Sequence, residues 1–185
     1  MKKNHGMQLL LVCLLISLLA VPSGSLLAAS AAEIDAKVDA KLKKFYKEVD
    51  GAKELGNKAK GVLVFPSVVK AGFGIGGEYG EGALRIGGNT VDYYSTAAGS
   101  IGFQFGVQSK AVILMFMGSG ALSKFRKSKG WEVGVDGSVA LIELGAGGSI
   151  DTTNIKDPII GFVFGQKGLM FNLTLEGSKM TKLDK

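Results

Sequence analysis

The 185-residue sequence contains one cysteine and one histidine, Cys13 and His5, and both lie near its N-terminus. Residues 32–185 therefore cannot form a disulfide within the chain, and they lack the usual nitrogen and sulfur ligands of zinc and copper. Serine–histidine and cysteine–histidine nucleophiles are excluded there for the same reason. These absences predict a domain without a metal or other cofactor and without this catalytic chemistry.

The N-terminal 31 residues have the pattern of a secretory signal peptide. Two lysines precede an apolar run from Leu9 to Val21, and Ala29-Ser30-Ala31 is a small-residue cleavage site. The run is shorter than the ~20 residues that a membrane-spanning helix needs. We predict that residues 1–31 are a signal peptide and that residues 32–185 form a single exported, periplasmic domain.

Residues 33–60 have the periodicity of an amphipathic helix. Gly51 is expected to break it, and the basic residues Lys37, Lys41 and Lys44 flank its apolar side. Apolar residues recur at steps of three and four, as on one stripe of a helix: Ile34, Val38, Leu42, Phe45, Val49, Ala52, Leu55 and Ala59.

The remainder of the chain is rich in glycine and has the alternation of β-strands. "GVLVFP" is predicted to be a strand that Pro66 closes, "SIGFQFGVQ" alternates in polarity, and "AVILMFM" is apolar throughout, as a central strand is. "WEVGVDGSVALIEL" and "IIGFVFGQKGLMFNLTLEGSKM" continue the pattern, with a hairpin turn at residues 166–168. One short helix, starting at a Ser119 cap and ending at Gly130, interrupts the strands.

These patterns predict an α+β fold. Its N-terminal amphipathic helix, broken near Gly51, packs on a glycine-rich, mainly antiparallel sheet, which is curved or closes into a barrel-like sandwich with one short inserted helix.

The stretch "KAGFGIGGEYGEG" contains the spacing G-x-G-x-x-G at Gly72, Gly74 and Gly77. A dinucleotide-binding loop needs a helix after these glycines, and the further glycines of "EYGEGALRIGG" cannot sustain one. We therefore interpret the stretch as a curved hairpin whose glycines let the N-terminal helix pack tightly on the sheet.

Two enzymatic alternatives remain open at this point. Ser67 and Lys70 have the S-x-x-K spacing of penicillin-binding proteins and β-lactamases, although the partner motifs S-D-N and K-T-G are absent. Two carboxylates could instead catalyse glycoside hydrolysis, which needs no histidine. The candidates are Glu78, Glu81, Asp136, Glu143 and Glu176, and their spacing singles out no pair. We expect that the protein is not an enzyme.

The strongest candidate for a binding site is a basic amphipathic element. No acidic residue occurs from Tyr93 to Trp131. The basic residues of this stretch lie close in the sequence to Phe125 and Trp131, and they are Lys124, Arg126, Lys127 and Lys129. The cations suit an anionic membrane surface, into which the two aromatic rings are expected to insert. Charge runs are more often solvated helix faces. Nucleic acid is disfavoured because export separates the protein from it.

"GVLVFPSVVKAGFGIGGEYGEGALR" resembles the signature region of the SYLF domain family, and "ALSKFRKSKGWEVGVDGSVAL" and "GLMFNLTLEGS" resemble two further regions of it. Ala71 is a departure, because family members often have a second glycine there. The resemblance implies a lipid-binding domain. Eukaryotic members recognise phosphoinositides and some bind actin, whereas bacterial members are exported envelope proteins. The shared implication for this chain is contact with anionic lipid.

The resulting hypothesis is a non-enzymatic, periplasmic domain, peripherally associated with a membrane of anionic phospholipid. Its contact residues are Lys124, Phe125, Arg126, Lys127, Lys129 and Trp131, with a second contact through Lys37, Lys41 and Lys44. The alternative is a structural or protein-interaction module of the cell envelope, whose basic surfaces bind an acidic partner without any dependence on lipid.

Overall fold

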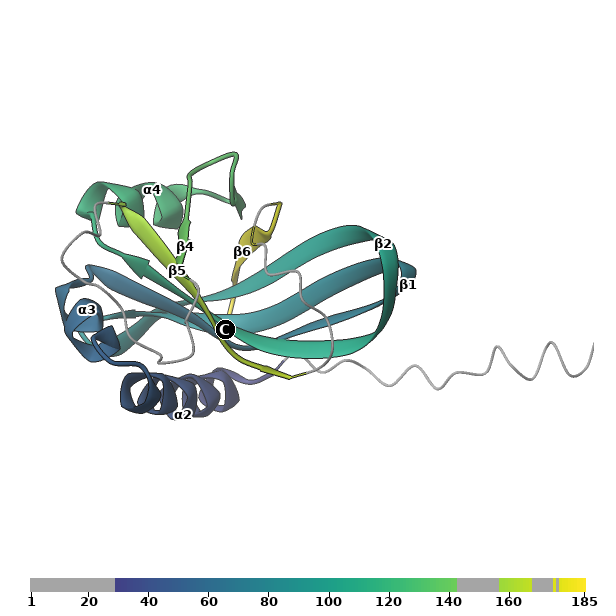
Figure 1. The fold of residues 1–185 in the computed structure, drawn as a ribbon. Helices are drawn as coiled ribbons and strands as arrows, with labels where there is room; N and C mark the ends of the chain where they lie inside the picture. Colours follow the sequence, from purple (N-terminus) through teal and green to yellow (C-terminus); the bar gives the residue numbers. More distant parts are fainter. Residues whose placement is uncertain (1–28, 143–156, 168–174, 176) are drawn as a thin grey trace, which may run out of the picture.

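The computed structural model describes residues 29–142, 157–167, 175 and 177–185. They form an α+β fold in which helices lie against a curled, mixed sheet (Figure 1). The predicted fold class is confirmed. No helix in these described ranges is long and apolar enough to cross a membrane.

The N-terminal segment forms two helices, α2 (Ala31–Glu48) and α3 (Ala52–Lys58). The hydroxyl of Ser30 accepts a hydrogen bond from the Glu33 amide at 3.2 Å and so caps the start of α2. Gly51 lies between the helices with φ of 81°, a left-handed conformation that costs glycine little. The predicted break near Gly51 is therefore confirmed.

Two long antiparallel strands dominate the sheet, β1 (Gly61–Ile86) and β2 (Asn89–Phe116). The expectation that Pro66 closes the first strand is wrong, because β1 continues through it for another twenty residues. The register between β1 and β2 shifts between Phe65 and Val68. Proline, which has no amide hydrogen, is tolerated at such an irregularity of the ladder.

The shorter strands pair around β2. β5 (Ile159–Lys167) pairs with the C-terminal end of β2, and β6 (Lys179–Leu183) pairs with its N-terminal part. β3 (Trp131–Glu132) extends the sheet beyond β6, and β4 (Ala140–Ile142) runs parallel to β5. The other pairings between these strands are antiparallel, as predicted. The predicted turn at residues 166–168 extends beyond the described residues.

The helix α4 (Ser119–Lys127) is the predicted insertion between strands. Its N-cap is Gly118 and not Ser119, and no side chain caps it. Its C-cap is Ser128, whose hydroxyl accepts a hydrogen bond from the Gly130 amide. The helix therefore ends three residues before Gly130.

The sheet has a hydrophobic core on each face. The C-terminal end of β2, "AVILMF", is buried on both sides, as expected for a central strand. Ala111, Ile113 and Met115 face the core beneath α2 and α3. Val112, Leu114 and Phe116 face the core beneath α4. Both cores consist of residues from Ala29 onward, so a chain of residues 29–185 contains the complete described core.

The glycines of β1 allow the strand to fold back over itself. A Cβ atom on Gly82 would lie 2.1 Å from the carbonyl oxygen of Val64, and one on Gly80 would lie 2.8 Å from that of Ser67. These distances are shorter than real carbon–oxygen contacts, so only glycine fits. The glycines thus pack against the first half of the same strand, and the prediction that they pack against the N-terminal helix is wrong.

Candidate anion-binding site

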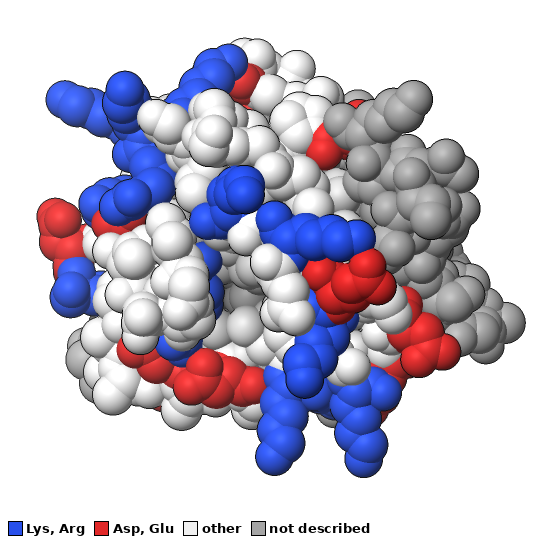
Figure 2. All heavy atoms as spheres, turned by 90° about the vertical axis from the view of Figure 1, so that its left-hand side faces the viewer, with Lys and Arg blue, Asp and Glu red and all other residues white. Residues whose placement is uncertain are grey.

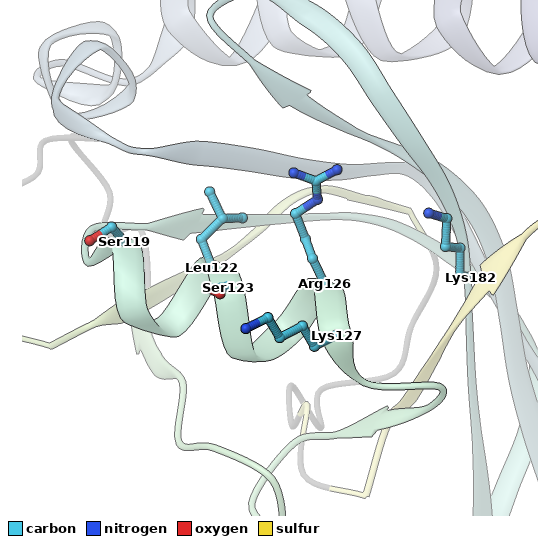
Figure 3. Close-up of a pocket in the computed structure, with 6 residues that line it drawn as sticks. All are labelled: Ser119, Leu122, Ser123, Arg126, Lys127 and Lys182. Atoms are coloured by element: carbon cyan, nitrogen blue, oxygen red, sulfur yellow. The ribbon is translucent and has the colours of Figure 1, made fainter.

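An open pocket of about 350 Å³ lies between α4 and β6 (Figure 3). Five of its lining residues come from α4 and one comes from β6, and most of them carry a hydroxyl or a positive charge. The lining residues are Ser119, Leu122, Ser123, Arg126, Lys127 and Lys182.

The helical period of α4 separates a buried side from a polar side. Leu122 and Phe125 are buried in the core beneath the helix. Arg126 and Lys127 extend from the last turn, and Lys182 reaches the same pocket from β6 (Figure 3). The first turn of α4 contains no acidic residue. The helix thus presents cations and hydroxyls on the side that β6 flanks.

Asp92 of β2 orients two of these cations. Its carboxylate lies 2.9 Å from Nε of Arg126 and 2.5 Å from Nζ of Lys182, and it is itself almost completely buried. Lys127 has no hydrogen-bonding or ionic partner in the part of the chain that the structure describes. Two cations therefore contact one carboxylate, and Lys127 adds a third positive charge at the pocket, so the site retains a net positive charge.

This arrangement suits a phosphate or a carboxylate. An arginine held through Nε keeps its two terminal nitrogens for a second partner, and its planar group matches the oxygens of a phosphate. The hydroxyls of Ser119 and Ser123 are further hydrogen-bond donors at the pocket wall. The described residues contain no group of three histidine, cysteine or acidic side chains that could hold a metal ion.

The other predicted cations of this element are also exposed. Lys124 and Lys129 lie on the surface, and the ammonium group of Lys124 donates a hydrogen bond to the backbone oxygen of Asp136. The described part of the chain offers Lys129 no ionic partner.

The expected aromatic contacts with a membrane require a correction. The side chains of Phe125 and Trp131 are 0% and 2% exposed, and their rings meet edge to face with centroids 5.5 Å apart. Phe125 also contacts the rings of Tyr94 and Phe116. Both residues therefore belong to the core beneath α4, and the expectation that they insert into a membrane is wrong.

The lysines of α2 do not join the basic pocket. α2 and α4 pack on opposite faces of the sheet (Figure 1). Lys37 lies 2.6 Å from Glu33 and Lys44 lies 3.8 Å from Glu48, so two of the three predicted contact lysines have a carboxylate on their own helix. Lys41 is only partly exposed.

Basic and acidic side chains alternate on the end of the molecule that carries α3 and α4 (Figure 2). The two groups of lysines that the sequence suggested therefore do not form one continuous basic surface.

Sequence reasoning missed Asp92 and Lys182. Tyr94 of β2 pairs with Lys182 of β6, which brings a C-terminal lysine next to Asp92. Only this pairing, between residues far apart in the sequence, could have revealed them.

The enzymatic alternatives find no assembled site among the described residues. Ser67 is exposed and Lys70 is buried, because residues three apart on a strand point to opposite faces of the sheet. Ser67 instead contacts the hydroxyl of Ser109 at 3.0 Å. Among the carboxylates, Glu78 pairs with Lys110 and Glu81 pairs with Lys185. Glu143 and Glu176 lie outside the described residues.

Comparison with known families agrees with the sequence analysis. Residues 97–185 match the family model Ysc84, described as Las17-binding protein actin regulator. This match confirms the resemblance to the SYLF domain family. No curated protein matches the chain. The matched segment contains α4, β6 and all of the residues that line the pocket.

Proposed function

We propose, on the premise that residues 97–185 are those of a SYLF (Ysc84) domain, that this protein is a non-enzymatic lipid-binding domain. The family is consistent with lipid or membrane binding. In the proposal, the pocket beside α4 binds the phosphate of an anionic phospholipid headgroup. The signal peptide pattern of residues 1–31 supports a periplasmic location with peripheral attachment to the membrane.

The observation that carries this proposal is the cluster of Arg126, Lys127 and Lys182 around a pocket with serine hydroxyls. Each lysine or arginine near an anionic surface contributes about 1 kcal/mol of attraction. Because Phe125 and Trp131 are buried, this contact has no aromatic insertion of its own. Binding through the pocket should therefore be electrostatic, reversible and sensitive to salt.

The test is co-sedimentation of the 29–185 chain with vesicles of phosphatidylcholine, with and without phosphatidylglycerol, across a salt series. The test variant is Lys127→Glu with Lys129→Glu, because both lysines are exposed and neither has an ionic partner in the described part of the chain. Loss of two attractions of about 1 kcal/mol each lowers affinity for anionic vesicles roughly 30-fold.

The matched control is Lys43→Glu with Lys53→Glu, which makes the same change of charge on exposed lysines of α2 and α3. It should bind anionic vesicles almost as well as the unchanged protein. Equal losses for the two variants would show that net charge and not the pocket governs binding. Binding that ignores both phosphatidylglycerol and salt would refute an electrostatic contact.

The family description itself favours one alternative, because it names the binding of a protein, Las17. An acidic protein of the envelope could occupy the same basic pocket. Retention of one stoichiometric protein partner by the 29–185 chain in the absence of lipid, and its loss with the Lys127→Glu and Lys129→Glu variant, would support this function instead.

A further inference from the structure

The hairpin of β1 and β2 has an unusual distribution of charge where it curls. We call residues 67–79 and 97–109 the curl. They contain two charged residues, Lys70 and Glu78, and each side chain is turned inward and is only 9% exposed. Gln108, at the end of the curl, and Lys110, just beyond it, are buried still further. Polar side chains thus lie on the inside of the curl, next to the buried Val68.

The pairing of the strands explains how these polar groups meet. Lys70 is paired with Gln108 across the ladder, and Lys110 lies opposite Val68, so these side chains share one face. Glu78 lies farther along the same two-stranded ribbon, where it pairs with Ala98. Because the ribbon curls, Oε2 of Glu78 comes to lie 3.0 Å from Nζ of Lys110. The curl therefore encloses the Glu78–Lys110 ion pair and one additional lysine, Lys70.

Among the side chains that the structure describes there, the outer face of the curl is largely apolar. Ile75 is 76% exposed and Val107 is 71% exposed, and Val69 and Tyr79 are also exposed. Val107 is the neighbour of the buried Gln108, so alternation along β2 here places the apolar residue outside and the polar residue inside.

This polarity is the reverse of that expected for a sheet surrounded by water. Exposed apolar surface is unfavourable in water by about 25 cal/mol per Å². Enclosing charged side chains also carries a desolvation penalty. Apolar residues outside and polar residues inside are instead the pattern of strands that face lipid. The two features have a common explanation if the medium outside the curl is itself apolar.

The border of the apolar face has the chemistry of a membrane interface. The hydroxyl of Tyr79 donates a hydrogen bond to Oε1 of Glu81 at 2.9 Å, and Lys185 pairs with the same carboxylate at 3.0 Å. Tyrosine is enriched where proteins cross from acyl chains to headgroups, because its ring is apolar and its hydroxyl is polar. A charged pair that is only 10–12% exposed therefore lies directly beyond Tyr79, at the border of the apolar face.

We propose that the outer face of the curl enters the boundary between the headgroups and acyl chains of a membrane. The contact residues are Val69, Ile75, Tyr79 and Val107. The curl lies at the end of the molecule away from α4 (Figure 1), so this contact is separate from the basic pocket and does not depend on anionic lipid. Its occupant is the acyl region of the bilayer.

The test places a polarity-sensitive dye at single positions of the 29–185 chain, which contains no cysteine of its own. The labelled variants are Ile75→Cys and Val107→Cys, with Val135→Cys as the matched control. Val135 is 74% exposed, nearly as much as Ile75 at 76%, but it lies in the turn after β3. The vesicles are pure phosphatidylcholine in high salt, where the basic pocket contributes little.

We expect a blue shift at positions 75 and 107 when vesicles are added, and quenching there by lipids with brominated acyl chains. Position 135 should show neither effect. The variant Ile75→Asp with Val107→Asp should lower partitioning into neutral vesicles roughly tenfold or more, because it removes apolar contacts and adds charge. The variant Val135→Asp should leave partitioning unchanged, and circular dichroism verifies the fold of both.

Two outcomes would overturn the proposal. Dyes at positions 75 and 107 that remain in water when vesicles are present would show that the curl does not contact lipid. A blue shift that appears without vesicles, together with a doubled mass in light scattering, would show that a second copy of the chain covers this face. The two proposals fail separately. An absence of salt-dependent binding to anionic vesicles would refute the basic pocket and would not change the dye result at positions 75 and 107.

Discussion

Nζ of Lys110 lies 3.0 Å from Oε2 of Glu78, and the two side chains are almost completely buried inside the curl of β1 and β2. A buried ion pair adds little net stability, because both groups lose their hydration. Removing one partner is much more costly, because the other charge stays buried without compensation.

The variant Lys110→Met should therefore be strongly destabilised, by about 3–5 kcal/mol. Adding Glu78→Gln should recover a large part of this loss, because the uncompensated carboxylate is then removed. Urea unfolding of the two single variants and the double variant measures the coupling free energy. Additive losses in this cycle would contradict a direct interaction between the two side chains.

The close approach within β1 gives a prediction for two glycines of the same strand. Gly82→Ala places a Cβ 2.1 Å from the Val64 carbonyl oxygen, and this backbone atom cannot move aside easily. We expect a loss of ~3 kcal/mol or more in the free energy of unfolding, or failure to fold. Gly77→Ala meets its nearest atom at 3.7 Å and should be tolerated. Thermal unfolding distinguishes the pair, and equal melting temperatures would contradict the folded-back strand.

Trp131 provides an intrinsic probe, since it is the only tryptophan of the chain. It is buried against Phe125, so its fluorescence should be blue-shifted in the free protein and should stay unchanged when vesicles are added. Phe125→Ala should destabilise the protein by about 3–5 kcal/mol through loss of core packing. A vesicle-induced shift of Trp131 emission at full binding would contradict this burial and would support insertion of Trp131 into the membrane.

Tyr94 predicts a change of stability at alkaline pH. Burial, assisted by the nearby Asp92 carboxylate, raises the pKa of Tyr94 to about 12. An unfolded tyrosine ionises near pH 10. The contribution of the neutral buried phenol is thus fully present below about pH 10 and is lost as pH rises through about 12.

The variant Tyr94→Phe should therefore lose less stability than the unchanged protein between about pH 10 and 12, by up to about 2 kcal/mol. At pH 7 the substitution should cost little, because the Tyr94 hydroxyl has no hydrogen-bond partner among the described residues. Urea unfolding at several pH values measures both effects. Parallel pH profiles for the two proteins would contradict the raised pKa.

Local patterns in the sequence predicted those features that depend on near neighbours along the chain. The helical stripe from Ile34 to Ala59 and its break at Gly51 follow from the 3.6-residue period and the freedom of glycine. The apolar run at residues 111–116 identified the central strand, because only a strand covered on both faces lacks polar alternation. The mainly antiparallel α+β fold followed from the order of these elements.

Tertiary structure decided which side chains meet across long separations in the sequence. The amphipathic pattern around α4 could not show that Phe125 and Trp131 are buried in a core, because the same pattern also fits a membrane-facing helix. Asp92 and Lys182 meet only through the register of β2 with β6. The sequence determined the elements through short-range periodicity, whereas strand register and the curl of one hairpin determined which polar groups lie inside and which apolar groups face outward.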